Sequence, residues 1–170
     1  MNEHMLNLQE FTENIESNYV TDYGAEIGTV FCHIFERATG TDPIRDFFDN
    51  ISEFDFFDPE KFDAEYIRKT PYTDSLNMMI SGIIKETQYN EHFMSWSKGE
   101  EYLNLFLHEL EGSKTVYTNS GWTKSTSKNS YEKELDLVGY SGISYSYWYD
   151  YGFIIVTEKK IGVLWFGDEG

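Results

Sequence analysis

Apolar residues recur at helical spacing through the first 112 residues of this chain and alternate with polar residues after that point. Two stripes with i, i+3 and i+4 spacing predict amphipathic helices over residues 8–19 and 27–38, the second closed by Gly40. A third stripe, over residues 76–84, is the most regular and predicts a helix that buries one face.

All three prolines stand where a helix can begin. Proline at the first helical position loses no needed hydrogen bond, and the residue before it can cap the free amides. The capping box Ser97-x-x-Glu100 predicts a further helix that ends at Gly112, so we expect about five helices in this part of the chain. The prolines follow their capping residues in the pairs Asp42-Pro43, Asp58-Pro59 and Thr70-Pro71.

From Lys114 onward the pattern is that of short strands separated by turns. We expect strands over residues 116–122, 131–138, 143–148, 153–157 and 161–166. Connections this short join antiparallel neighbours. The sequence therefore predicts one α+β domain over residues 1–170, in which a mainly helical part (1–112) precedes an antiparallel sheet (113–170).

Composition indicates a folded chain. With 13 Phe, 13 Tyr and 4 Trp among 170 residues, the sequence has too many aromatic residues for a disordered acidic protein. Cys32 is the only cysteine, so no internal disulfide can form. The N-terminus lacks the basic start and apolar run of a signal peptide, and no apolar stretch is long enough to span a bilayer. We expect a cytoplasmic protein with no membrane contact.

The charge of the chain is strongly one-sided. Its formal net charge is −17, and 23 of the 30 acidic residues lie in the first 112 positions, which carry only seven Lys and Arg. Such a field repels nucleic acid and anionic membranes and attracts a cationic partner. The densest segment, residues 42–65, holds nine acids and two bases.

No motif for catalysis or metal binding stands out in the sequence. The four histidines show no HExxH pattern and no i, i+4 pair suited to zinc. The neighbours Cys32 and His33 point about 100° apart on the predicted helix and cannot act together there. The carboxylates of residues 55–63 lack the glycine of a calcium loop and include Pro59. We therefore expect no enzyme activity, no metal and no cofactor.

Four tyrosines alternate along the third predicted strand and its end, at positions 145, 147, 149 and 151. If the strand is unbroken, their side chains share one face. Such a row can pack within the sheet as aromatic cross-strand pairs, or form a patch that binds a protein or a carbohydrate. Both interpretations remain open on the sequence alone.

The acidic segment is the leading candidate for a binding site. On the helix predicted to start at Pro43, Asp46, Asp49 and Glu53 form a stripe opposite the apolar face, and like charges on one face do not favour a helix. Aromatic residues after this helix would serve as anchors for a basic partner. The predicted partner-binding residues are Asp42, Asp46, Asp49, Glu53, Asp55, Asp58, Phe56, Phe57, Tyr147, Tyr149, Asp168 and Glu169.

The C-terminal sequence from Gly152 to Glu169, which includes the strand KIGVLWFGDE, resembles bacterial immunity proteins that neutralise polymorphic toxins, including those of contact-dependent growth inhibition. The similarity covers about twenty residues, together with the small size, acidity and late aromatic sheet. The resemblance implies a non-enzymatic protein that binds a cognate toxin domain, commonly a basic nuclease, with carboxylates in the place of nucleic-acid phosphates. It transfers no individual binding residue.

Two other functions remain open. The carboxylates could imitate the DNA backbone, as in an anti-restriction protein, which predicts competition with duplex DNA for many DNA-binding proteins. Alternatively, a carbohydrate-active enzyme could use two of the thirty acids together with the tyrosine row, which requires two carboxyl groups about 5–9.5 Å apart in a cleft.

Overall fold

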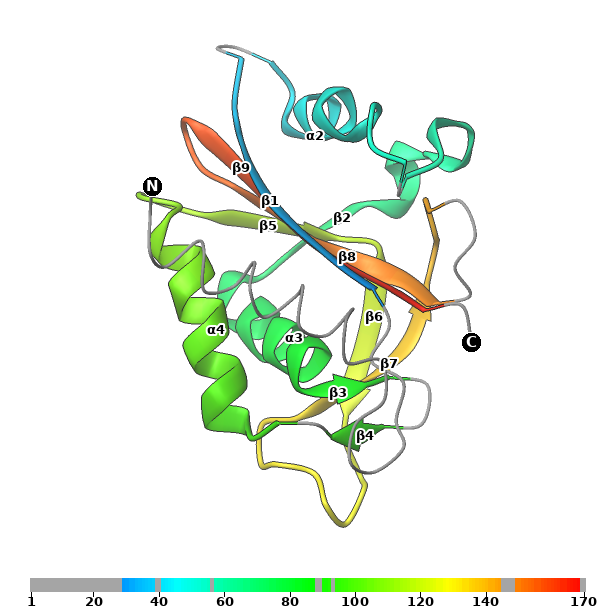
Figure 1. Ribbon diagram of the computed structural model, residues 1–170, viewed down its shortest axis with the longest axis vertical. Coiled ribbons are helices and arrows are strands. Elements are labelled where there is room, and N and C mark those ends of the chain that lie inside the picture. The colour runs from blue at the N-terminus through cyan, green and yellow to red at the C-terminus, as the bar shows by residue number, and fades with distance from the viewer. Residues whose placement is uncertain are drawn as a thin grey trace.

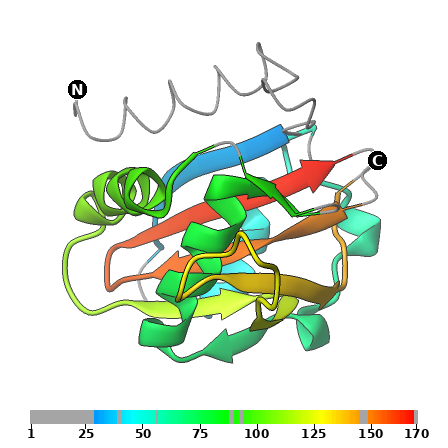
Figure 2. The same cartoon turned by 90° about the horizontal axis from the view of Figure 1, so that it is seen from below.

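The computed structural model of the chain describes residues 29–38, 41–55, 57–87, 90–92, 94–144 and 149–168. At its centre is a five-stranded antiparallel sheet with the order β1-β9-β8-β5-β2 (Figures 1 and 2). Along that order the strands are β1 (Thr29–Glu36), β9 (Lys160–Asp168), β8 (Tyr149–Val156), β5 (Thr115–Thr118) and β2 (Arg68–Thr70).

Helices cover both faces of this sheet (Figure 1). One face carries α2 (Pro43–Ile51), followed by two short 3-10 turns, η1 (Pro59–Lys61) and η2 (Ala64–Tyr66). The opposite face carries α3 (Tyr72–Ile84) and α4 (Trp96–His108). Two small ribbons lie beside α3, formed by β3 (Lys85–Glu86) with β4 (Glu91–His92) and by β6 (Ser120–Lys124) with β7 (Leu135–Tyr140).

The two central strands bury both of their faces. In β8, Phe153 and Ile155 belong to the core under α3 and α4, whereas Ile154 and Val156 belong to the core under α2. Successive side chains of a strand point to opposite faces, so a continuous apolar run is what a strand covered on both sides requires. Trp165 of β9, which is 0% exposed, completes the core on the α2 side.

Local signals explain the helix ends. Asp42 caps α2 by accepting hydrogen bonds from the backbone amides of Ile44 and Arg45. Ser95 caps α4 through the amide of Lys98, so α4 begins at Trp96, just before the predicted capping box. Gly99 lets α4 approach α3, because a Cβ atom at this position would collide with the side chain of Ile84.

The prediction of a helical half followed by a sheet is wrong. Within the described residues there are three α-helices, and they are interleaved with strands. Residues 29–36 of the second predicted helix form β1, which pairs with β9 along its whole length. This segment is rich in β-branched and aromatic residues, and its pairing with the distant C-terminal strand overrides the local helical spacing. The turn after Pro59 is a single 3-10 turn, and the helix predicted over residues 8–19 lies outside the described residues.

Most of the other predicted elements are present within the described residues, with shifted ends. The helices that start near Pro43, Pro71 and Ser97 are confirmed as α2, α3 and α4, and the last two strands as β8 and β9. The strand predicted over residues 116–122 divides at Asn119, where the chain leaves the central sheet for the β6–β7 ribbon. Residues 145–148 of the third predicted strand lie outside the described residues.

Candidate functional site

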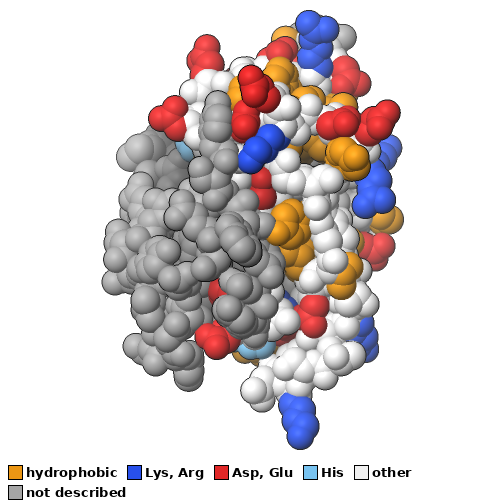
Figure 3. All heavy atoms as spheres, turned by 90° about the vertical axis from the view of Figure 1, so that its right-hand side faces the viewer, with side chains coloured by type: hydrophobic (Ala, Val, Ile, Leu, Met, Phe, Trp, Pro, Cys, Tyr) orange, Lys and Arg blue, Asp and Glu red, His pale blue; other side chains and the backbone are white. Residues whose placement is uncertain are grey.

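Residues 42–66, from the cap of α2 to the end of η2, form a layer that we call the acidic layer. Two of its large apolar side chains point inward: Phe47 and Phe57 are 0% and 1% exposed, and both contact the ring of Trp165. Most of its carboxylates point outward, and in Figure 3 acidic side chains, with several basic ones among them, lie at the upper end, over α2 and the turns that follow it. The exposed ones are Asp42, Asp49, Glu53, Asp55, Glu60, Asp63 and Glu65.

Three aspartates of the layer also shape the backbone. Asp42, Asp58 and Asp63 each precede a helical turn and accept hydrogen bonds from its first amides, at 2.9–3.2 Å. Negative charge at a helix start is stabilising because it satisfies free amides and complements the helix dipole. Part of the acidity is therefore explained by local structure, whereas the exposed acids between these caps, such as Glu53 and Asp55, have no such role.

The layer contains two bases, Arg45 and Lys61, against nine acids. Arg45 lies 3.9 Å from Asp49, with both side chains more than half exposed, and such a surface pair contributes little to stability. The ammonium group of Lys61 donates a hydrogen bond to the carbonyl of Ser144, at 2.8 Å. The outward surface of the layer thus keeps a strongly negative character.

Asp46 differs from the neighbouring acids because its side chain is buried. Its carboxylate accepts a hydrogen bond from Nε of Arg37 at 3.1 Å, and the same guanidinium donates to the carbonyls of Thr41 and Thr157. This ion pair joins the end of β1 to α2. Asp46 is therefore not placed to contact a partner, and the predicted stripe of three acids keeps only Asp49 and Glu53 on the surface.

Among the predicted aromatic anchors, Phe57 is the one whose side chain the structure describes, and it is not on the surface. Phe57 was expected to be exposed, but it is buried against Phe31 and Trp165 because the loop after α2 folds back onto the sheet. Phe56, Tyr147 and Glu169 lie outside the described residues. Tyr149 and Asp168 are paired opposite each other at the ends of β8 and β9.

Tyr151 is the tyrosine of the alternating row whose side chain the structure describes, and it fits the interpretation that the row packs within the sheet. Tyr151 is 2% exposed and stacks on Phe166 with ring centroids 5.1 Å apart, so at this position the tyrosine packs in the core. Tyr66, in contrast, is 55% exposed and follows the acids of η2. Sequence reasoning missed Tyr66; the available signal was its position directly after Glu65, outside any amphipathic stripe.

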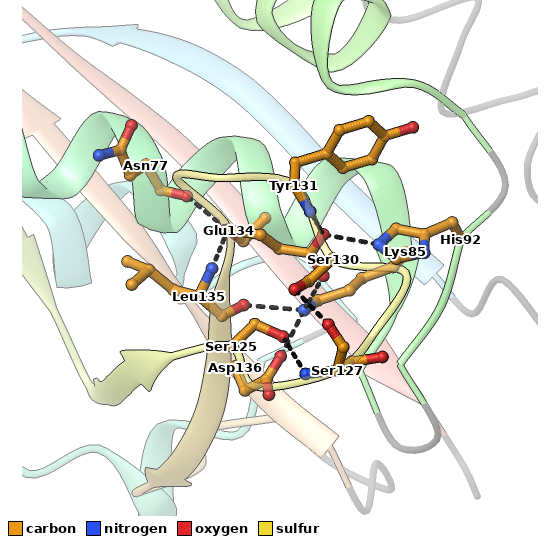
Figure 4. A network of polar contacts seen from close by, with 11 residues as sticks. Asn77, Lys85, His92, Ser125, Ser127, Ser130, Tyr131, Glu134, Leu135 and Asp136 are labelled. Atoms are coloured by element: carbon orange, nitrogen blue, oxygen red, sulfur yellow. Dashed lines mark hydrogen bonds and ion pairs between the residues drawn. The ribbon is translucent and has the colours of Figure 1, made fainter.

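A buried polar network lies on the opposite side of the sheet, between α3 and the β6–β7 ribbon (Figure 4). Its centre is Lys85, whose side chain is fully buried. The ammonium group donates to Oε2 of Glu134 and Oδ1 of Asp136, both at 2.7 Å, and to the carbonyl of Leu135 at 2.8 Å. All three of its hydrogens are used, so Lys85 acts as a cross-link between the end of α3 and the start of β7.

Glu134 connects this network to the loop before β7. Its Oε1 accepts a hydrogen bond from the amide of Tyr131 and lies 2.7 Å from Nε2 of His92. Burial alone raises the pKa of Glu134, but its hydrogen bonds with Lys85, Tyr131 and His92, together with the charge of Lys85, outweigh this effect and hold the pKa below its usual value. The network thus has the features of a structural support.

A second buried carboxylate supports the acidic layer from within. Asp150, 2% exposed, accepts hydrogen bonds from Nε1 of Trp165 at 2.6 Å and from the amide of Ser144 at 2.5 Å. This fixes the segment around Ser144, which pairs with Phe57 and accepts the hydrogen bond of Lys61. Neither Asp150 nor Trp165 was recognised in the sequence as part of the site's support.

Other site types have little support in the described part of the chain. No group of three or more His, Cys, Asp and Glu side chains there could hold a metal ion. No helix in that part is long and apolar enough to cross a membrane. A cleft of about 680 Å³ lies between the end of α4 and the β8–β9 turn, lined by charged residues of both signs, among them Glu109, Glu111 and Lys159.

Comparison with protein-family models, with curated proteins and with solved structures finds no match to this chain. The functional argument therefore depends on the geometry and charge of its own residues.

Proposed function

We propose that this chain is an immunity protein, which binds a cognate basic toxin domain and neutralises it without catalysing a reaction. The observation that carries the proposal is the arrangement of the acidic layer: seven exposed carboxylates lie over a buried aromatic core. The resemblance of the C-terminal strand to such proteins supports the same function.

The layer has the physical features of a surface that captures a cationic protein. Its exposed acids exceed the bases that could neutralise them, and they stand on a folded, well-packed support. A concentrated negative field steers a basic partner toward the surface and raises the association rate by about 10–10³-fold at low salt. Fast capture is useful when a toxin must be blocked before it acts.

The contact surface is assigned to the exposed residues of the layer. Tyr66 offers an exposed aromatic ring beside Glu65, and tyrosine is enriched among the residues that contribute most to binding energy at interfaces. Asp49, Glu53 and Asp55 provide the charges nearest the end of α2. Asp46 and Phe57 support this surface from inside and make no contact with the partner.

Charge reversal on two faces tests this proposal. The chain is co-expressed with the product of the adjacent upstream gene, and the affinity of the purified pair is measured. We expect the triple variant Asp49→Lys, Glu53→Lys and Asp55→Lys to lose at least about tenfold in affinity, since rim charges direct association. A matched variant with Glu100→Lys, Glu101→Lys and Glu111→Lys changes the net charge equally on exposed residues of α4 and the turn after it, on the opposite side, and keeps most of the affinity.

The possible results separate the competing functions. If the upstream product does not bind, the immunity function is wrong for this pair. If both variants lose affinity equally, only the net charge matters and the assignment to the acidic layer is wrong. If duplex DNA displaces the partner, and unrelated DNA-binding proteins bind as tightly, the chain is a DNA mimic instead.

A further inference from the structure

His33 lies in an aromatic cluster where the acidic layer rests on the edge strand β1. Its side chain is half-buried, and its ring centroid is 4.4 Å from that of Phe31 and 6.0 Å from that of Phe35, on the same face of the strand. The ring of Phe54, from the turn after α2, packs 5.2 Å from His33 and 5.0 Å from Phe31. His33 and Phe31 thus form the surface of β1 on which Phe54 packs, and we call this surface the seat of Phe54.

Phe54 determines where two exposed carboxylates of the layer stand. It lies between Glu53 and Asp55, both exposed, in the turn that follows α2. The amide of Phe54 donates to the carbonyl of Ile51, and its carbonyl accepts from the amide of Phe57. If Phe54 leaves its seat on β1, the positions of Glu53 and Asp55 change with it.

The surroundings of His33 favour the neutral imidazole. The residue opposite it on β9 is Val163, and the turn contributes the ring of Phe54. Among the charged groups of these elements, Arg37 and Asp46 pair with each other. Glu53 and Asp55 flank Phe54 and are exposed, and no described carboxylate forms an ion pair with His33. Burial lowers the pKa of His33.

We propose that protonation of His33 loosens the seat of Phe54 on β1, so that mild acid frees residues 52–55 and weakens the grip of the acidic layer on its partner. The structural part rests on the aromatic cluster and on the burial of His33 within it, and the effect on the partner rests on the proposed function. A histidine whose folded pKa is lowered binds fewer protons folded than unfolded. The neutral imidazole of His33 therefore stabilises the fold fully when the pH is above the pKa that His33 has in the unfolded chain. This contribution falls as the pH drops below that value.

The structural part is tested on the free protein. We expect the histidine signal of His33 to titrate below its usual range in NMR spectra. Hydrogen-exchange protection of the amides of Phe54 and Phe57, corrected for intrinsic rates, should fall between about pH 7.5 and pH 5, by up to about tenfold for each unit by which the pKa is lowered. Amides in the middle of α4 are the internal control and keep their protection.

A variant separates His33 from the other titrating groups. His33→Phe keeps an aromatic ring in the cluster and removes the proton site, so the protection of Phe54 and Phe57 should no longer depend on pH. A titration at or above the usual histidine range would overturn the inference, because the rings would then stabilise the imidazolium. Equal protection at both pH values in the wild-type chain would overturn it too, and neither result requires the variant to fold.

The effect on the partner is measured separately. Affinity for the upstream gene product should weaken between about pH 7.5 and pH 5.5 for the wild-type chain and less for His33→Phe. Failure to bind at neutral pH rejects the proposed function and leaves the exchange result on His33 as it stands. Binding that weakens equally in both proteins shows that His33 does not regulate the site.

Discussion

Replacement of Lys85 by methionine should destabilise the protein strongly. Methionine nearly fills the volume of the lysine stem but leaves two carboxylates without their shared cation, and Glu134 is fully buried. Removing one partner of a buried ion pair costs about 3–5 kcal/mol, because the remaining charge stays buried and unpaired. For a domain of this size, 1 kcal/mol corresponds to about 2–4 °C in the melting temperature, so Lys85→Met should lower it by about 6–20 °C.

Chemical denaturation of a double-mutant cycle tests this reasoning. If the destabilisation comes from the uncompensated carboxylate, adding Glu134→Gln to Lys85→Met should restore about 2 kcal/mol or more relative to the sum of the single variants. Asp136 is partly exposed, so water can solvate it when Lys85 is absent. A loss below about 1 kcal/mol for Lys85→Met, or additive single variants, would refute the argument that this ion pair holds β7 to α3.

Other groups give further expectations. The pKa of Glu134 is lowered from its usual 4.5 in the folded chain, so the ionised carboxylate stabilises the fold above pH 4.5, and this stabilisation is lost as the pH falls through the folded pKa. The difference in unfolding free energy between wild type and Glu134→Gln should therefore shrink below about pH 4.5. Phe57→Ala should cost about 3–5 kcal/mol in denaturation experiments, as for a core aromatic, whereas an exposed anchor would cost under about 1 kcal/mol. Burial raises the pKa of the Cys32 thiol, so a thiol reagent should react with the folded chain only as fast as it opens; rapid labelling would contradict the burial of this residue.

The fold was predictable where sequence signals are local. The cap at Asp42 and the apolar stripe of α3 produced the expected helices, and the apolar run in β8 produced the expected buried strand. The strand β1 was not predictable in this way, because a segment with apolar residues at positions 30, 31, 32, 34 and 35 satisfies a helical stripe and a two-sided strand equally. Only pairing with β9, about 130 residues later, decides between them.

The candidate site was predictable in location but not in detail. Composition identified residues 42–65 as the acidic segment, and most of its acids are exposed. Which acid is buried could not be predicted, because Asp46 pairs with Arg37, the residue directly after β1, and the sequence pattern had predicted a helix in place of that strand. Because the sheet was expected only in the last third of the chain, the sequence also led to the prediction that Phe57 is exposed, whereas the sheet buries it.

The dependence of association rate on salt tests the role of the acidic layer most directly. Stopped-flow mixing with the upstream gene product should show a wild-type rate that falls by about tenfold or more between about 50 mM and 200 mM salt. The variant with Asp49, Glu53 and Asp55 changed to lysine should associate slowly and with little salt dependence, while the matched α4-side variant should retain most of the wild-type slope. A wild-type rate that does not respond to salt, or a slope that survives reversal of the acidic layer, would contradict electrostatic capture by this surface.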